Sequence, residues 1–187
     1  CFRDGSTAIK RRAWLVAAVA TAKPPPIGCV GGKVLFPDNR IKHAGLIMGV
    51  GNGVGRAHYR LHKDSLGNFM RLHVAQNVSA LSSEFMAIRK DVFVGVGGFD
   101  ASNFADAAAD ADLCLRLRGD GLVNVWTPWA EVVQTSPPRT VGEDELERLK
   151  AKWAEYFERD PYFNPNLSND DADFELAFPP RVNKFSL

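Results

Sequence analysis

Apolar residues recur at helical spacing in three segments of the chain, and these segments are predicted to be helices. They span residues 9–23, 110–118 and 143–157. The first ends at three consecutive prolines, which cannot continue a helix. The second ends at an Asp-Gly pair, and glycine suits the position after a helix. The third begins with three acidic residues, which the helix dipole favours at that end.

Short apolar and β-branched runs bounded by turn residues predict strands at 27–36, 74–79, 85–88, 122–127 and 131–134, the last two separated by Pro128. The glycine-rich segment 49–55 is predicted to be a mobile surface loop, because its alternating glycines match neither phosphate-binding pattern. The alternation of strands and helices indicates an α/β fold. The strand–helix–strand units are too few for a complete doubly wound sheet, which indicates one part of a larger fold.

The length of 187 residues suits one domain, 1–187, in which residues 140–187 form a helix followed by an extended tail. An apolar fraction of 45% and a charged fraction of 24% are typical of a folded globular protein. Lysine plus arginine number 23 and aspartate plus glutamate 22, so the net charge is +1. Without a basic excess or stripe, nucleic acid is excluded as a partner.

The three cysteines, Cys1, Cys29 and Cys114, are widely spaced and predict neither a zinc site nor a disulfide framework. A reduced, cytoplasmic setting fits this usage. No run reaches the roughly 18 apolar residues of a membrane-spanning helix. The sequence begins at Cys1 without an initiator methionine, which indicates processing or, as we favour, a cut from a longer protein.

Two acidic positions are candidates for chemistry. Gly97-Gly98-Phe99-Asp100 is predicted to be a tight turn whose glycines permit close approach of the backbone. Asp110 stands at the predicted start of a helix, where free N–H groups and the dipole keep a carboxylate ionised. Such a carboxylate at the edge of a pocket can take a proton from a sugar hydroxyl. The alternative is a helix-capping aspartate without a chemical role.

Stretches that follow one another along nearly the whole chain resemble family 2 glycosyltransferases, especially the bacterial branch that builds rhamnose-rich and O-antigen polysaccharides. No single stretch is decisive, but their number and order argue against a chance match. The matching stretches are Trp14-Leu15, residues 27–38 (IGCVGGKVLFPD), His43-Ala44-Gly45, residues 76–80 (QNVSA), residues 88–93 (IRKDVF), residues 97–100 (GGFD), residues 110–116 (DADLCLR), residues 127–131 (TPWAE) and residues 160–167 (DPYFNPNL).

The resemblance implies the C-terminal, acceptor-side portion of a GT-A fold, a mixed sheet with flanking helices. It implies a single displacement, with inversion, from a nucleotide-sugar donor to a glycan or lipid-linked acceptor. A lipid-linked acceptor would place the protein in the cytoplasm at the inner face of the membrane, as a peripheral protein. The resemblance assigns the catalytic base to Asp110 and the substrate-binding positions to Gly97, Gly98, Phe99, Asp100, Asp112 and His43.

The chain departs from the family pattern where a metal ion is expected. The family holds a divalent cation, Mg²⁺ or Mn²⁺, with an Asp-x-Asp motif in a nucleotide-binding half that this sequence lacks. Asp4 is the acidic residue left at the corresponding place, and a loop or capping aspartate is an equal interpretation. Gln134 stands where the family has a histidine, and an amide is a poor metal ligand beside imidazole.

Two alternatives to an enzyme therefore stay open. One is a truncated, non-catalytic remnant that binds a glycan or a protein partner, which Gln134 favours and the intact Asp110 segment opposes. The other is an interaction domain that uses the apolar face of the helix predicted over 143–157.

Overall fold

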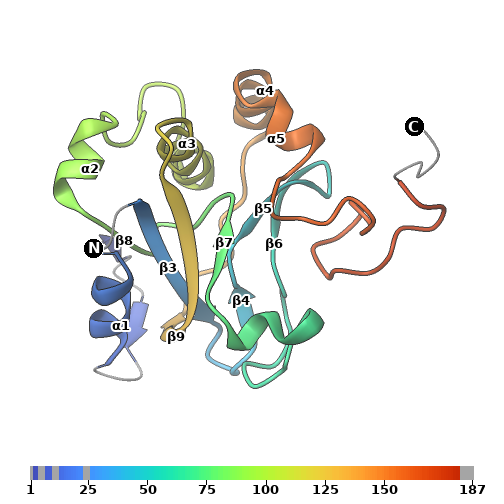
Figure 1. Cartoon of the computed structure of the whole chain (residues 1–187), viewed down its shortest axis with the longest axis horizontal. Helices are drawn as coiled ribbons and strands as arrows, with labels where there is room; N and C mark the ends of the chain where they lie inside the picture. Colours follow the sequence, from blue (N-terminus) through green and yellow to red (C-terminus); the bar gives the residue numbers. More distant parts are fainter. Residues whose placement is uncertain (1, 4–6, 10–12, 23–25, 182–187) are drawn as a thin grey trace.

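Two long parallel strands, β3 (Ile27–Leu35) and β9 (Val123–Gln134), form the centre of a mixed sheet (Figure 1). The computed structural model describes residues 2–3, 7–9, 13–22 and 26–181. Within these residues the sheet has seven strands, and its other pairings are antiparallel. The remaining strands are β8 (Phe85–Ile88) and β4 (Ile41–His43) beside β3, β7 (Gln76–Val78) and β2 (Thr7–Ile9) beside β9, and β1 (Phe2–Arg3) beside β8.

Helices α1 (Ala13–Ala22) and α3 (Asp106–Gly119) cover opposite faces of the two central strands. Val30 and Val34 pack in clusters with residues of α1, whereas Cys29 packs in the cluster that contains α3. Successive side chains of a strand point to opposite faces, so a strand covered on both sides is mostly apolar, as β3 is apart from Lys33. The predicted α/β class, a mixed sheet with flanking helices, is confirmed.

The helix predicted over residues 9–23 is confirmed for Ala13–Ala22 but is wrong at its beginning. Thr7–Ile9 forms strand β2, which pairs antiparallel with residues 132–134 of β9. The edge of β9 supplies the backbone hydrogen bonds for this strand. That partner lies more than a hundred residues away in the sequence, so local helical spacing gave no sign of it.

The glycine-rich segment 49–55 is a β-hairpin, and the predicted mobile loop is wrong. Strands β5 (Leu46–Val50) and β6 (Gly53–Arg56) pair antiparallel, and Gly51 and Asn52 form the turn with positive φ values of 59° and 57°. At Gly49, φ is 77° and a Cβ atom would lie 2.1 Å from the carbonyl oxygen of Phe157. Glycine is therefore required there because the hairpin packs closely against helix α5 (Ala154–Glu158).

Strand β9 continues through Pro128, where the sequence predicted a break. Its parallel pairing with β3 shifts register between the pairs Gly31–Trp126 and Lys33–Glu131. Proline has no N–H to donate, so a strand tolerates it where the ladder is interrupted. The two predicted strands are therefore one.

The helix predicted over 143–157 is interrupted at Trp153, which separates α4 (Glu143–Lys152) from α5. After α5, the described chain to residue 181 has no regular helix or strand and packs against the β5–β6 hairpin through Phe163 and Phe174. Two short helices that the sequence did not predict, η1 (Asn68–His73) and α2 (Lys90–Gly95), lie in the connections around β7 and β8.

Candidate functional site

Asp110 lies one turn inside α3 and not at its N-terminus, so both the helix-start and the capping interpretations are wrong. The helix begins at residue 106, because the alanine-rich segment 106–109 favours helix. Asp110 is buried, with 1% of its surface exposed. The hydroxyl of Ser82 donates to its Oδ2 at 3.2 Å, and the backbone N–H of Ser83 donates to the same oxygen at 2.9 Å.

Burial raises the pKa of Asp110, because a carboxylate without water around it is disfavoured. Hydrogen bonds from Ser83 and Ser82 and the charge of Arg139 offset part of this effect. Nη1 of Arg139 lies 3.7 Å from Oδ2 of Asp110. A raised carboxyl pKa, closer to neutral pH, is what a general base requires.

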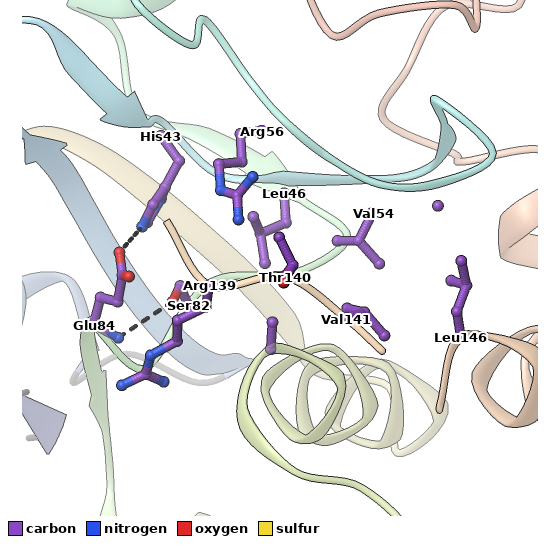
Figure 2. Close-up of a pocket in the computed structure, with 12 residues that line it drawn as sticks. His43, Leu46, Val54, Arg56, Ser82, Glu84, Arg139, Thr140, Val141 and Leu146 are labelled. Atoms are coloured by element: carbon purple, nitrogen blue, oxygen red, sulfur yellow. Dashed lines mark hydrogen bonds and ion pairs between the residues drawn. The ribbon is translucent and has the colours of Figure 1, made fainter. Parts of the chain in front are cut away.

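Ser82 and Arg139, which contact Asp110, line a pocket of about 150 Å³ (Figure 2). It lies between the β5–β6 hairpin, the first turn of α3 and the segment that leads into α4. Ser82 and Arg139 line it, and the Asp110 carboxylate lies behind these two residues. The polar lining residues are His43, Arg56, Ser82, Glu84, Arg139 and Thr140, and the larger apolar ones are Leu46, Val54, Val141 and Leu146.

Glu84 contacts a lysine and a histidine at one end of the pocket. Its carboxylate lies 2.7 Å from Nζ of Lys42 and 3.2 Å from Nε2 of His43. Burial alone would raise the pKa of Glu84, but the hydrogen bonds and charges of His43 and Lys42 outweigh it and lower the value to about 2. Lys42 is 0% exposed and also donates to the carbonyl oxygen of Ser136 at 3.1 Å. The acid is therefore ionised near neutral pH and serves to hold Lys42 and His43.

His43 lines the pocket near Asp110, as expected for a substrate-binding residue of the same site. Because ionised Glu84 can only accept a hydrogen bond, Nε2 of His43 carries the hydrogen. In the neutral ring, Nδ1 is then an acceptor, and this buried atom has no hydrogen-bond partner among the described residues. The substrate-binding role of His43 stays a prediction.

Asp112 faces a different part of the molecule from Asp110. Its carboxylate accepts from Nε of Arg116 at 2.8 Å and from Nε1 of Trp153 at 3.0 Å, and Nζ of Lys152 lies 2.7 Å away. These contacts join α3 to the end of α4, and Asp112 is 0% exposed. It does not line the pocket.

The Gly97–Asp100 turn is grouped with Asp112 and not with the pocket. Gly97 and Gly98 have φ values of 80° and 68°, as a tight turn requires, and the guanidinium of Arg116 donates to the carbonyl oxygen of Gly98 at 2.7 Å. Phe99 packs edge-on against Phe93 at 5.5 Å between ring centroids. Asp100 accepts from Ser102 and Asn103, and these hydrogen bonds lower its pKa. The candidate substrate-binding residues therefore fall into two groups, one at the pocket and one at this turn.

Of the two candidate metal ligands, the structure describes Gln134 alone. Gln134 is buried at the end of β9, and Asp4 lies outside the residues that the structure describes. Across residues 2–3, 7–9, 13–22 and 26–181, no three His, Cys, Asp or Glu side chains lie close enough to hold a metal ion. The binding of a divalent cation by Asp4 or Gln134 stays a prediction.

Sequence reasoning missed four pocket residues: Arg56, Ser82, Glu84 and Arg139. They come from separate connections and strand ends, so no local spacing links them. One signal was available in the sequence. Lys42 lies within a short apolar run next to His43, and a lysine inside a buried strand requires an acidic partner, which is Glu84.

We expect Asp112→Asn to destabilise the protein by about 1.5–3 kcal/mol, the typical contribution of a hydrogen bond to a charged group. The amide removes the negative charge that Lys152 and Arg116 contact, although it can still accept from Trp153. Urea unfolding measures the change. Asp91→Asn is the control, because the Asp91 side chain is 76% exposed and an exposed ion pair contributes little, so the free energy of unfolding should stay nearly unchanged.

Among the described residues, no helix is both long and apolar enough to cross a bilayer. This finding concerns spanning helices alone. The predicted peripheral contact with a membrane stays a prediction.

No known protein-family model matches the sequence. The chain is 38% identical over 176 residues to the uncharacterized protein y4gI of Sinorhizobium fredii, an alignment that covers 89% of this chain and 19% of that protein. It is also 29% identical over 178 residues to the O-antigen biosynthesis protein RfbC of Myxococcus xanthus, covering 87% of this chain and 13% of that protein. The chain thus spans less than a fifth of either relative and is similar, over most of its own length, to part of a protein named for O-antigen biosynthesis.

Proposed function

We propose that this chain forms the acceptor-side part of an inverting sugar transferase in the biosynthesis of a bacterial surface polysaccharide. The similarity to an O-antigen biosynthesis protein supports the process. The observation that carries the reaction is Asp110, a buried carboxyl group with a raised pKa directly beside a pocket. The GT-A fold and the family 2 assignment rest on the sequence resemblance and belong to this proposal.

Asp110 would act as the general base. It takes the proton of an acceptor hydroxyl, directly or through one water, as the hydroxyl oxygen bonds to the anomeric carbon of the donor sugar. The bond from that carbon to the nucleoside diphosphate breaks in the same step, so the configuration inverts. Ser82 and the backbone N–H of Ser83 hold the carboxylate in place, and Arg139 balances its charge. Much of the rate would come from holding both sugars in line.

The substrates belong to the proposal as well. The donor is a nucleotide sugar, and the acceptor is a glycan or a lipid-linked glycan at the cytoplasmic face of the membrane. A divalent cation assists the departure of the diphosphate. The nucleotide and the cation are held mainly by the other half of the fold, so this chain by itself should bind nucleotide sugars weakly.

A second function is favoured by one observation. The Asp110 carboxylate lies behind Ser82 and Arg139 and is almost fully buried, which hinders direct contact with an acceptor hydroxyl and favours a protein that binds a glycan without transferring sugar. In that case the pocket is a recognition site. The two functions differ in whether a donor sugar is consumed.

The test is a transfer assay with the protein expressed from its complete reading frame, radiolabelled uridine and thymidine diphospho-sugars, a polysaccharide acceptor and Mg²⁺ or Mn²⁺. We expect label in the acceptor and release of nucleoside diphosphate in equal amounts. Glycan binding without consumption of any donor would instead establish the recognition function. Micromolar affinity of the 187-residue chain alone for a nucleotide sugar would contradict the placement of the donor site in the other half.

A further inference from the structure

Arg56 places an unpaired cation in the pocket. Its half-buried side chain extends from β6 into the pocket near His43 (Figure 2). Among the described residues, no hydrogen bond or salt bridge reaches its guanidinium group, and burial lowers its pKa. A guanidinium group is always charged and carries five N–H donors that suit carboxylate and phosphate oxygens. Partial removal of the Arg56 guanidinium from water without a paired anion is unfavourable, so an anionic ligand would stabilise it.

The nearby acids make their close contacts with other groups, although the charge of Glu84 attracts Arg56 through space. Glu84 already contacts Lys42 at 2.7 Å and His43 at 3.2 Å. Asp110 accepts from Ser82 and Ser83 and lies near Arg139. Each acid is thus matched by groups other than Arg56, and the pocket keeps a positive charge at Arg56.

His43 independently indicates a ligand that donates a hydrogen bond. Its side chain is buried and lines the pocket, and its Nδ1 atom, an acceptor in the neutral ring, has no hydrogen-bond partner in the described part of the chain. A buried acceptor without a donor is unfavourable. A hydroxyl group of a ligand supplies such a donor.

The size and apolar wall of the pocket suit one sugar ring. A cavity of about 150 Å³ admits a six-membered ring, as benzene binding to an engineered cavity of that size shows. Leu46, Val54, Val141 and Leu146 form the apolar side, which suits the C–H face of a pyranose.

We propose that the pocket binds a sugar that carries an oxyanion, either a carboxylate or a phosphate ester. Arg56 pairs with the oxyanion, and Nδ1 of His43 accepts a hydrogen bond from a ring hydroxyl. This inference rests on the proposed function, because it names the class of sugar that the same site takes.

The test is an NMR titration of the protein from its complete reading frame with D-glucuronate, glucose 6-phosphate and glucose. One charge-assisted pairing contributes about 1.5–3 kcal/mol, so the better of the two anionic sugars should bind roughly 10- to 100-fold more tightly than glucose. Arg56→Gln should abolish this preference, and it should fold normally because it removes no side-chain hydrogen bond or close ion pair among the described residues. Arg60→Gln is the control, since Arg60 lies over the ring of Phe36 outside the pocket, and it should keep the preference.

The outcomes separate this inference from the proposed function. Tighter binding of glucuronate identifies a carboxylate, and tighter binding of glucose 6-phosphate identifies a phosphate ester. Equal affinity for all three sugars, or a preference that survives in Arg56→Gln, overturns the inference, even if the enzyme transfers neutral sugars. An Arg56-dependent preference in a protein that consumes no donor sugar would keep the inference and remove the transferase.

Discussion

Glu84→Gln is expected to destabilise the protein by about 3–5 kcal/mol, the typical effect of removing one partner of a buried ion pair. Lys42 is 0% exposed, and Glu84 is the acid that contacts its ammonium group. Without that acid, a buried positive charge remains with the carbonyl and hydroxyl oxygens of Ser136 as partners. Urea unfolding at neutral pH measures the loss.

The double variant Lys42→Met with Glu84→Leu is the control. Replacing both charges by apolar groups of similar size should recover most of the stability, because no unpaired charge is left. Acid unfolding gives a second readout. The Glu84 pKa of about 2 lies below its ordinary value of 4.5, so its stabilisation is complete above about pH 4.5 and is lost as the pH falls towards 2. A loss below 1 kcal/mol in Glu84→Gln would show that the pair is not buried as described.

The class of the fold and most of its elements could be predicted from the sequence, because the apolar pattern follows burial. Apart from Lys33, β3 carries no polar side chain, because helices cover both faces. The errors arose where distant partners decide the structure. The sequence of the β5–β6 hairpin is typical of a glycine-rich loop, and its packing of Gly49 against Phe157 is visible only in the structure. Strand β2 forms only because it pairs with the edge of β9.

The candidate site could be predicted only in part, because residues that are distant in the sequence assemble it. Asp110 was singled out by its place in a helix and by the family resemblance, but its pocket is assembled from residues 43 to 146. Asp112, two residues further along the helix, points about 200° away and joins α3 to α4 instead. Helical spacing predicts that these two carboxylates point in different directions, but only their partners in the structure show which one lies beside the pocket.

Asp110→Asn is expected to lower the turnover of sugar transfer by roughly 10²–10⁴, the typical contribution of a general base. The amide oxygen can still accept from Ser83 and Ser82, but the amide group cannot take the proton of an acceptor hydroxyl. Burial already disfavours the charged form of Asp110, so its loss should change stability little. Donor affinity should stay unchanged, because the proposed base acts on the acceptor.

Asp160→Asn is a closely matched control. Asp160 is 6% exposed, accepts from Ser79 at 2.7 Å and from the backbone N–H of Met48 at 2.9 Å, and also has a pKa raised by burial. It does not line the pocket beside Asp110. Its replacement should affect stability as Asp110→Asn does and leave turnover unchanged, which separates loss of the base from loss of a buried carboxylate.

The pH dependence of kcat for sugar transfer, measured for the wild-type protein and for Asp110→Asn, tests the central claim most directly. A base must be deprotonated to act, so the wild-type rate should fall as the pH drops through the Asp110 pKa, which burial raises above 3.8. Asp110→Asn should be slow at every pH and should lack this acidic limb. A variant that keeps the wild-type rate, or that keeps the acidic limb, would contradict the assignment of Asp110 as the base.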